Sequence, residues 1–150
     1  MSGAAAIRVL APELQIIQLS AHAFSEALFF FLHKNWFRDK HDLQLVKFLD
    51  LYMVCAKFAI DWQAVHEIAE AHDAVAGLAF ALHCVNELFP GAVPAAVVRR
   101  TAEHASGWRD AYVDREGNVH QWEAPFLDRM FDMDGKVGEI RRKFPALAFG

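Results

Sequence analysis

Cysteine is scarce in this sequence, and no cysteine stands in a metal-binding spacing. Only Cys55 and Cys84 occur among the 150 residues, and neither belongs to a Cys-x-x-Cys pair. This argues against a disulfide framework and against a structural zinc site. Both residues lie in apolar runs, so we interpret them as buried free thiols of a reducing compartment.

Membrane-spanning and export signals are also lacking. The longest apolar runs, such as Ala27–Leu32, are far shorter than the roughly 20 residues that a bilayer-spanning helix needs. The segment Met1–Ala6 is small and uncharged, without the basic start of a signal peptide. We therefore expect a cytoplasmic protein that does not have a membrane as a partner.

Basic residues do not outnumber acidic ones. The chain holds 15 lysines and arginines against 19 aspartates and glutamates, which leaves a formal net charge of -4. Nonspecific binding to nucleic acid depends on a basic field that meets the phosphates. The small basic cluster Arg141–Lys143 is typical of a solvated helix face. We therefore expect no nucleic-acid partner.

The short motifs of common enzymes are missing as well. The sequence has no glycine-rich phosphate loop and no serine in a nucleophile elbow. A zinc-protease motif starting at His66 would need a second histidine where the chain has Glu70. Asp132 and Asp134 match part of a calcium loop, but Met130 occupies its first ligand position. The motifs therefore predict no catalytic residue and no metal site.

The sequence is rich in apolar residues with a helical period. Hydrophobic residues make up 55% of the chain and include 13 phenylalanines, against a usual apolar share of roughly 45–50%. They recur three and four residues apart, which predicts an all-α fold. We expect a single-domain helical bundle of five to six helices over residues 1–150, with an extended lead-in over residues 1–10. The helices are expected at about residues 12–31, 41–59, 62 onward, 74–89, 94–107 and 124–143.

Several local signals place the ends of these helices. Pro12 suits the first turn of a helix, because its missing N–H would be unpaired there in any case. Asp61 is a favourable N-cap for the helix that follows it. Residues 112–122 form an irregular insert in which a turn signal separates two β-prone pieces, so we expect a short hairpin or an irregular loop. Gly135 and Gly138 are expected to interrupt the last helical segment.

Histidine and aspartate provide the candidates for a ligand site. His22 with Glu26, and His83 with Glu87, are pairs four residues apart that could supply ligands from facing helices. Metal-binding bundles combine such carboxylates with Glu-x-x-His motifs, which the chain lacks, so partly buried histidines are the better interpretation. Asp50 interrupts an apolar run and therefore lies either on the wet side of its helix or buried beside a partner.

The order of short landmarks along the chain resembles a known family. A Leu-Ala-Pro-Glu-Leu start leads to His22, and Leu49-Asp50-Leu51, Ile60-Asp61-Trp62 and a Pro-Gly turn followed by Pro94 come after it. This order is similar to the helical, C-terminal part of the bacterial uncharacterised nucleotidyltransferase family, over about Leu10–Val98. Members of that family carry a polymerase-β-like catalytic domain followed by helices.

The resemblance implies which residues belong to the helical lobe and which residues are missing. His22, Asp50, Asp61 and Trp62 match its pattern. The superfamily holds metal and nucleotide with a Gly-Ser turn followed by paired aspartates on a strand, and only a few residues precede the first helix here. No catalytic residue can be carried over. Mg²⁺ and a nucleoside triphosphate are implied only together with a separate catalytic lobe.

These observations lead to one main hypothesis and three alternatives. The main hypothesis is a non-catalytic helical module that positions a substrate or binds a protein partner. The alternatives are one half of a split nucleotidyltransferase, a small helical enzyme or ligand-binding protein, and a homo-oligomer joined by surplus phenylalanines. The isolated chain is not expected to be catalytic, and a protein partner or a second copy is expected. The candidate ligand or interaction residues are His22, Asp50, Asp61, Trp62 and His83.

Overall fold

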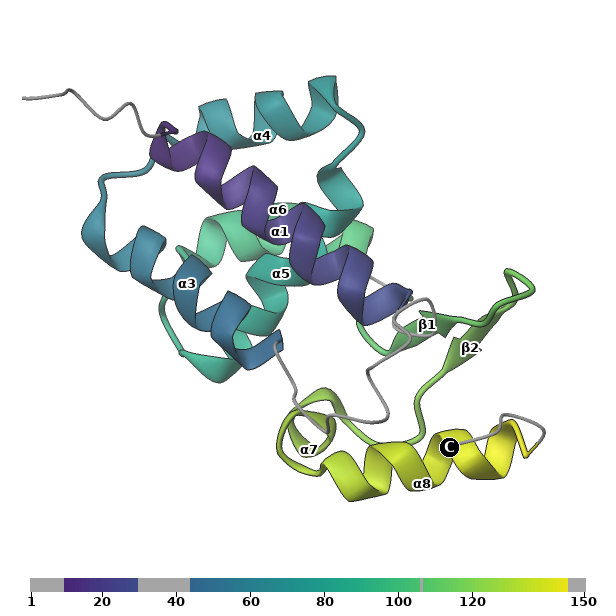
Figure 1. Ribbon diagram of the computed structural model, residues 1–150. Coiled ribbons are helices and arrows are strands. Elements are labelled where there is room, and N and C mark those ends of the chain that lie inside the picture. Colours follow the sequence, from purple (N-terminus) through teal and green to yellow (C-terminus); the bar gives the residue numbers. More distant parts are fainter. Residues whose placement is uncertain (1–9, 30–43, 106, 146–150) are drawn as a thin grey trace, which may run out of the picture.

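The computed structural model describes residues 10–29, 44–105 and 107–145. Within these ranges it contains seven helices and one two-stranded sheet, so the predicted all-α class is confirmed (Figure 1). The predicted lead-in before Leu10 and the predicted start of the second helix at about residue 41 lie outside the described residues. In chain order the elements are α1 (Pro12–Leu28), α3 (Gln44–Lys57), α4 (Trp62–Ala71), α5 (Val75–Leu88), α6 (Ala95–Ala105), β1 (Ala111–Val113), β2 (Val119–Gln121), α7 (Phe126–Phe131) and α8 (Met133–Lys143).

Helix α5 forms the centre of the bundle. Eight of its 14 residues are buried, and α1, α3, α4 and α6 all pack against it (Figure 1). Gly77 faces α1, where a Cβ added to it would lie 3.5 Å from the Phe24 side chain, an ordinary van der Waals distance. The rings of Phe24 and Phe48 lie 5.4 and 6.3 Å from that of Phe80, respectively. Aromatic side chains from α1 and α3 therefore meet on α5.

The start of α4 is set by Asp61, as the sequence predicts. Its Oδ1 accepts hydrogen bonds of 3.0 Å from the backbone N–H groups of Gln63 and Ala64, two of the donors that a helix start leaves unpaired. The backbone N–H of Asp61 donates to Glu13 Oε1 at 3.2 Å. The cap thus also ties the start of α4 to the first turn of α1, which begins at Pro12 as expected.

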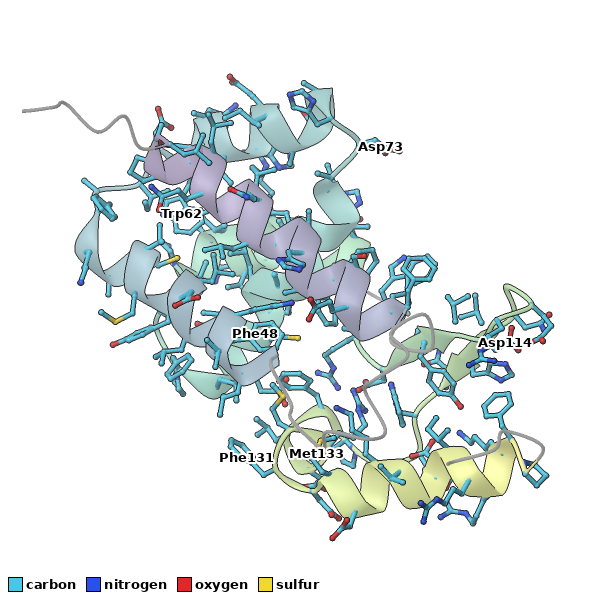
Figure 2. All side chains as sticks on the ribbon, in the orientation of Figure 1. Phe48, Trp62, Asp73, Asp114, Phe131 and Met133 are labelled. Atoms are coloured by element: carbon cyan, nitrogen blue, oxygen red, sulfur yellow. The ribbon has the colours of Figure 1, made fainter. Side chains whose placement is uncertain are left out.

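The insert predicted at residues 112–122 is a hairpin. Strands β1 and β2 pair antiparallel, with Tyr112 opposite His120. Asp114 lies in the hairpin at the end of β1 (Figure 2). Its Oδ1 accepts hydrogen bonds from the backbone N–H groups of Glu116 and Asn118 and closes the loop. Gly117 has φ +89°, a conformation that favours glycine. Of the two alternatives that the sequence leaves open, the hairpin is the one observed.

The last helical segment is divided at a different place from the one that the sequence suggests. The expected interruption at Gly135 and Gly138 is wrong, because both glycines lie inside α8. The break between α7 and α8 falls at Asp132, whose backbone has φ -116° and ψ 83° and whose Oδ1 accepts from the Gly135 N–H at 2.8 Å. The side chain of Asp132 therefore caps the start of α8, and the two glycines do not end a helix.

The two cysteines differ in burial. Cys84 is buried as expected, whereas Cys55 is half-buried, and both are free thiols. Burial raises the pKa of Cys84, and it raises that of Cys55 to about 11.

Phe131 on α7 is 69% exposed and points away from the bundle (Figure 2). None of the helices in the described part is long and apolar enough to cross a membrane.

The cap at Asp61 makes a testable contribution to stability. Replacing Asp61 with alanine removes both side-chain hydrogen bonds, and we expect a loss of about 1 kcal/mol in the free energy of unfolding, measured in urea. Asp61→Asn keeps an oxygen acceptor and should stay within about 0.5 kcal/mol of the parent protein. Equal losses for the two variants would show that the charge of Asp61, and not its cap, matters.

Candidate functional site

The predicted residue His22 belongs to a contact between α1 and α3. Its side chain is exposed, and its Nε2 lies 2.8 Å from Glu26 Oε1, one turn along α1. Glu26 also forms an ion pair with Lys47 of α3, whose side chain is largely buried. The i,i+4 pair expected from the sequence is therefore present, and it extends into a bridge between two helices.

Asp50 and His83 lie in other surroundings. Asp50 is exposed on α3, so the wet-side alternative describes it. His83 is half-buried on α5, where its Nε2 lies 3.1 Å from the carbonyl oxygen of Val98 in α6. Across the described ranges, no three His, Cys, Asp or Glu side chains are grouped so that they could hold a metal ion. The three candidates His22, Asp50 and His83 are thus on three helices, each with its own neighbours.

A pocket of about 290 Å³ opens where α5, α6 and the hairpin meet. We call it the junction pocket, and His83 is the candidate residue that lines it. The side chains around it are predominantly polar, with hydrogen-bond donors and acceptors on several elements. It is lined by His83, Ala102, Ala105, Gly107, Arg109, Asp110 and Gln121.

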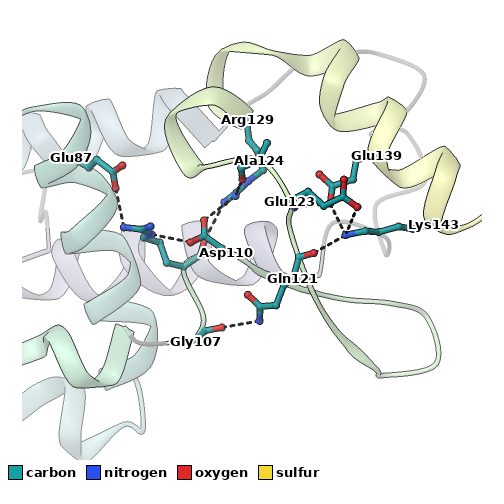
Figure 3. Close-up of polar contacts among 10 residues, drawn as sticks. Glu87, Gly107, Asp110, Gln121, Glu123, Ala124, Arg129, Glu139 and Lys143 are labelled. Carbon is teal, nitrogen blue, oxygen red and sulfur yellow. Dashed lines mark hydrogen bonds and ion pairs between the residues drawn. The ribbon is translucent and has the colours of Figure 1, made fainter.

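Asp110 connects the junction pocket to α7. Its Oδ1 accepts a hydrogen bond of 2.8 Å from Arg129 Nη1, and its Oδ2 accepts one of 3.1 Å from Arg109 Nε (Figure 3). Arg129 is only 6% exposed, and its guanidinium also donates to the carbonyl oxygens of Arg109 and Ala124. These hydrogen bonds all end on oxygens, and the guanidinium carbon also lies 5.5 Å from the centre of the Trp122 ring; together they compensate for the loss of water.

Arg109 is held from two sides at the rim of the junction pocket. Its guanidinium contacts Asp110 and lies 3.6 Å from Glu87 of α5 (Figure 3). Burial alone would lower the pKa of Arg109, but the two carboxylates outweigh it and raise the pKa. Gln121 Nε2 donates to the carbonyl oxygen of Gly107 at 3.3 Å. The polar side chains of the pocket are therefore fixed in orientation before any ligand arrives.

A second polar cluster joins the hairpin to α8. Glu139 is 3% exposed and accepts from the Glu123 N–H at 3.0 Å and from Lys143 Nζ at 2.7 Å (Figure 3). Lys143 also donates to the carbonyl oxygen of Gln121 at 2.7 Å. Burial, followed by the charges of nearby carboxylates such as Glu139, raises the pKa of Tyr112 to about 12. This cluster holds the hairpin against α8. It thereby also positions β2, whose last residue, Gln121, lines the junction pocket.

A smaller, more apolar pocket lies between α4 and α6, with α5 as its floor. Its volume is about 220 Å³, and the candidate residue Trp62 lines it. We call it the α4–α6 pocket. Its lining consists of Trp62, Gln63, Val65, His66, Leu78, Ala96, Val97, Arg100 and Thr101.

Comparison with known proteins places the chain in a family. The family model described as uncharacterised nucleotidyltransferase matches residues 2–90. The chain belongs to this family. The predicted family is therefore confirmed, although the match spans residues 2–90 and ends just after α5, short of the predicted end at Val98. No curated protein and no solved structure matches the chain.

Only some of the residues that line the two pockets could be predicted from the sequence. His83 was identified from its spacing to Glu87, and Trp62 from the landmarks of the family. Arg109, Asp110 and Arg129 were not identified, because Arg129 meets its partners about twenty positions away across the hairpin. The local signal in the sequence is the adjacent opposite charges of Arg109 and Asp110 before a β-prone piece. Such pairs are common on protein surfaces and do not by themselves indicate a site.

Removing Asp110 should leave the buried guanidinium of Arg129 without its charge partner. For Asp110→Ala we expect a loss of about 3 kcal/mol in the free energy of unfolding in urea, the lower end for breaking a buried ion pair, since Asp110 is partly exposed. Adding Arg129→Met removes the orphaned charge and should recover part of this loss. Asp128→Ala, which changes an exposed carboxylate next to Arg129, should cost less than about 1 kcal/mol. Additive losses in the double variant would contradict the pairing.

The hydrogen bonds of Asp114 in the hairpin predict that the stability of the protein depends on pH in the acid range. The hydrogen bond of 2.7 Å with His120, together with those from Asn118 and Glu116, lowers the pKa of Asp114 below its ordinary value of 3.8. The stabilisation is therefore complete above that value and is lost as the pH falls through the lowered folded-state pKa. In urea, the parent protein should lose stability more steeply than Asp114→Asn between about pH 4 and about pH 2. Parallel losses would contradict a lowered pKa in the folded state.

Proposed function

We propose that this chain is a non-catalytic helical module of a nucleotidyltransferase, which positions a substrate for a separate catalytic lobe. The observation that carries the proposal is the junction pocket, in which ion pairs around Asp110 fix the polar side chains. One wall of that pocket is α5, which lies within the family match. A pocket with several pre-oriented polar groups suits binding and orientation of a ligand.

The local surroundings of the paired aspartates support a non-catalytic role. Superfamily members resembling this chain use paired aspartates on a strand after a Gly-Ser turn. The sole Asp-x-Asp in this sequence is Asp132 to Asp134, at the start of α8 and not on a strand. Asp132 Oδ1 is engaged by the Gly135 N–H. These carboxylates therefore serve the start of a helix, which is a sufficient reason for their presence.

A positioning module of this kind needs a protein partner. Under the proposal, Mg²⁺ and the nucleoside triphosphate bind to the partner's catalytic lobe, whereas the junction pocket receives the molecule that accepts the nucleotidyl group. Its side chains offer both donors, from Arg109 and Gln121, and an acceptor, from Asp110. A polar acceptor substrate with hydroxyl groups matches this mixture better than an apolar one does.

The proposal predicts no nucleotidyl transfer by this chain alone. With α-labelled nucleoside triphosphates and Mg²⁺, we expect no label in protein or small-molecule acceptors, because the metal-binding aspartates of the superfamily are provided by the partner. The matched control is the double variant Asp132→Asn, Asp134→Asn. Label transfer by the parent protein that disappears in this variant would overturn the proposal.

A second measurement tests the positioning role directly. An open reading frame next to the gene, encoding a Gly-Ser turn and paired aspartates on a strand, would identify the catalytic partner of a split transferase. Mixing the two chains should then produce transfer, and Arg109→Gln should weaken it, whereas Arg99→Gln, an exposed change of the same charge on α6, should not. Equal activity of the partner with and without this chain would contradict a positioning role.

A further inference from the structure

The outer face of α3 is apolar, although this helix lies at the edge of the bundle (Figure 1). Val46, Leu49 and Met53 follow one another at spacings of three and four residues, so they form a single stripe. Their exposed fractions run from 37% for Met53 to 54% for Val46. The buried residues of α3, such as Phe48 and Leu51, belong to the core on the other side. An exposed apolar stripe, in contrast to single scattered apolar residues, is typical of an interface.

Two opposite charges lie on the same face as this stripe. Asp50 and Lys57 are seven residues apart, which is close to two helical turns, so both side chains project from one side of α3. The two positions are about 10.5 Å apart along the helix axis. Both residues are exposed, and neither side chain takes part in a hydrogen bond or an ion pair within the described part of the chain. Each charge is thus available to a partner.

The arrangement of these charges matches a second copy of the same chain. Two copies of α3 that pack antiparallel are related by a two-fold axis, which repeats every contact twice. An axis that crosses α3 beside Met53, midway between Asp50 and Lys57, brings Asp50 of each copy opposite Lys57 of the other. Both ion pairs then form at once. A parallel arrangement in register would instead place like charges opposite each other, which is unfavourable.

The same axis also brings apolar side chains together. The two Met53 side chains meet at the axis, and Leu49 of each copy lies opposite Phe58 of the other. Phe58 follows α3 directly and is 47% exposed. A contact of one helix per copy buries less than the roughly 1,200 Å² of a standard interface, and such small interfaces are typical of weak, reversible complexes.

We propose that α3 is a self-association surface, through which two copies of this chain form a weak antiparallel dimer. The apolar stripe provides the attraction, and the pairs of Asp50 with Lys57 fix the direction and the register. No residue of α3 lines the junction pocket, so the dimer does not depend on the role proposed for that pocket. Self-association can be measured whether or not the chain supports nucleotidyl transfer.

The first test is sedimentation velocity of the whole chain over a range of protein concentrations. We expect a reversible equilibrium of monomer and dimer with a Kd of roughly 1–100 μM. Leu49→Glu should raise this Kd about tenfold or more, because it places a charge in the apolar contact. The matched control is Leu14→Glu on α1, since Leu14 is 41% and Leu49 is 43% exposed. This control should leave the Kd within about twofold.

Charge reversal tests the ion pairs. Asp50→Lys and Lys57→Asp should each raise the Kd about tenfold or more, because each places like charges opposite each other twice. The double variant with both changes restores two opposite pairs and should return to within about threefold of the parent Kd. The two single variants, when mixed, should form a heterodimer. Glu103→Lys, an exposed change of the same charge on α6, should leave the Kd within about twofold.

Disulfide cross-linking tests the register. Met53→Cys places a thiol beside the two-fold axis, so oxidation should join two copies, because the Cα atoms are within the roughly 7 Å that a disulfide requires. Val46→Cys should not join them, since the two positions are about 22 Å apart along the helix axes in the antiparallel pair. The parent protein, which retains Cys55 and Cys84, gives the background.

Four results would overturn the proposal. The first is a monomer at every concentration, and the second is an equal effect of Leu49→Glu and Leu14→Glu. The third is that the double charge variant stays as weak as the single variants while its circular dichroism spectrum matches that of the parent protein. The fourth is that Val46→Cys cross-links as readily as Met53→Cys, as expected for a parallel pair. All the substituted residues are exposed, so the variants should fold like the parent protein.

Discussion

The burial of most of α5 is the constraint on which the other features of the molecule depend. A helix that exposes none of its residues fully needs apolar neighbours on several sides, and α1, α3, α4 and α6 provide them. The neighbours cannot all touch one another, so spaces remain where they diverge. Both pockets lie at such places: Leu78 of α5 lines the α4–α6 pocket, and His83 of the same helix lines the junction pocket.

Those parts of the fold that arise from local interactions could be predicted from the sequence. The period of the apolar residues indicated the helices, and Asp61 and Pro12 indicated where two of them begin, because a cap or a missing N–H acts within one turn. The break at Asp132 was missed for a related reason. Two glycines suggested a later break, but a glycine weakens a helix by only about 1 kcal/mol, whereas the cap of Asp132 starts a new helix directly.

The site was harder to predict because its contacts join distant residues. The pair His22 and Glu26 could be predicted, since the partners are one helical turn apart. The partners of Arg129 come from both sides of the hairpin, and no periodic pattern marks them.

The end of the family match bears on which part of the chain can determine a ligand. The match stops at residue 90, yet each pocket has walls on both sides of that boundary. Arg100 and Val97 of α6 complete the α4–α6 pocket, and Arg109 and Asp110 complete the junction pocket. Residues after 90 also cover a face of α5 that is too apolar to remain exposed. The segment that follows the matched helices thus completes both the cover over α5 and the walls of the two pockets.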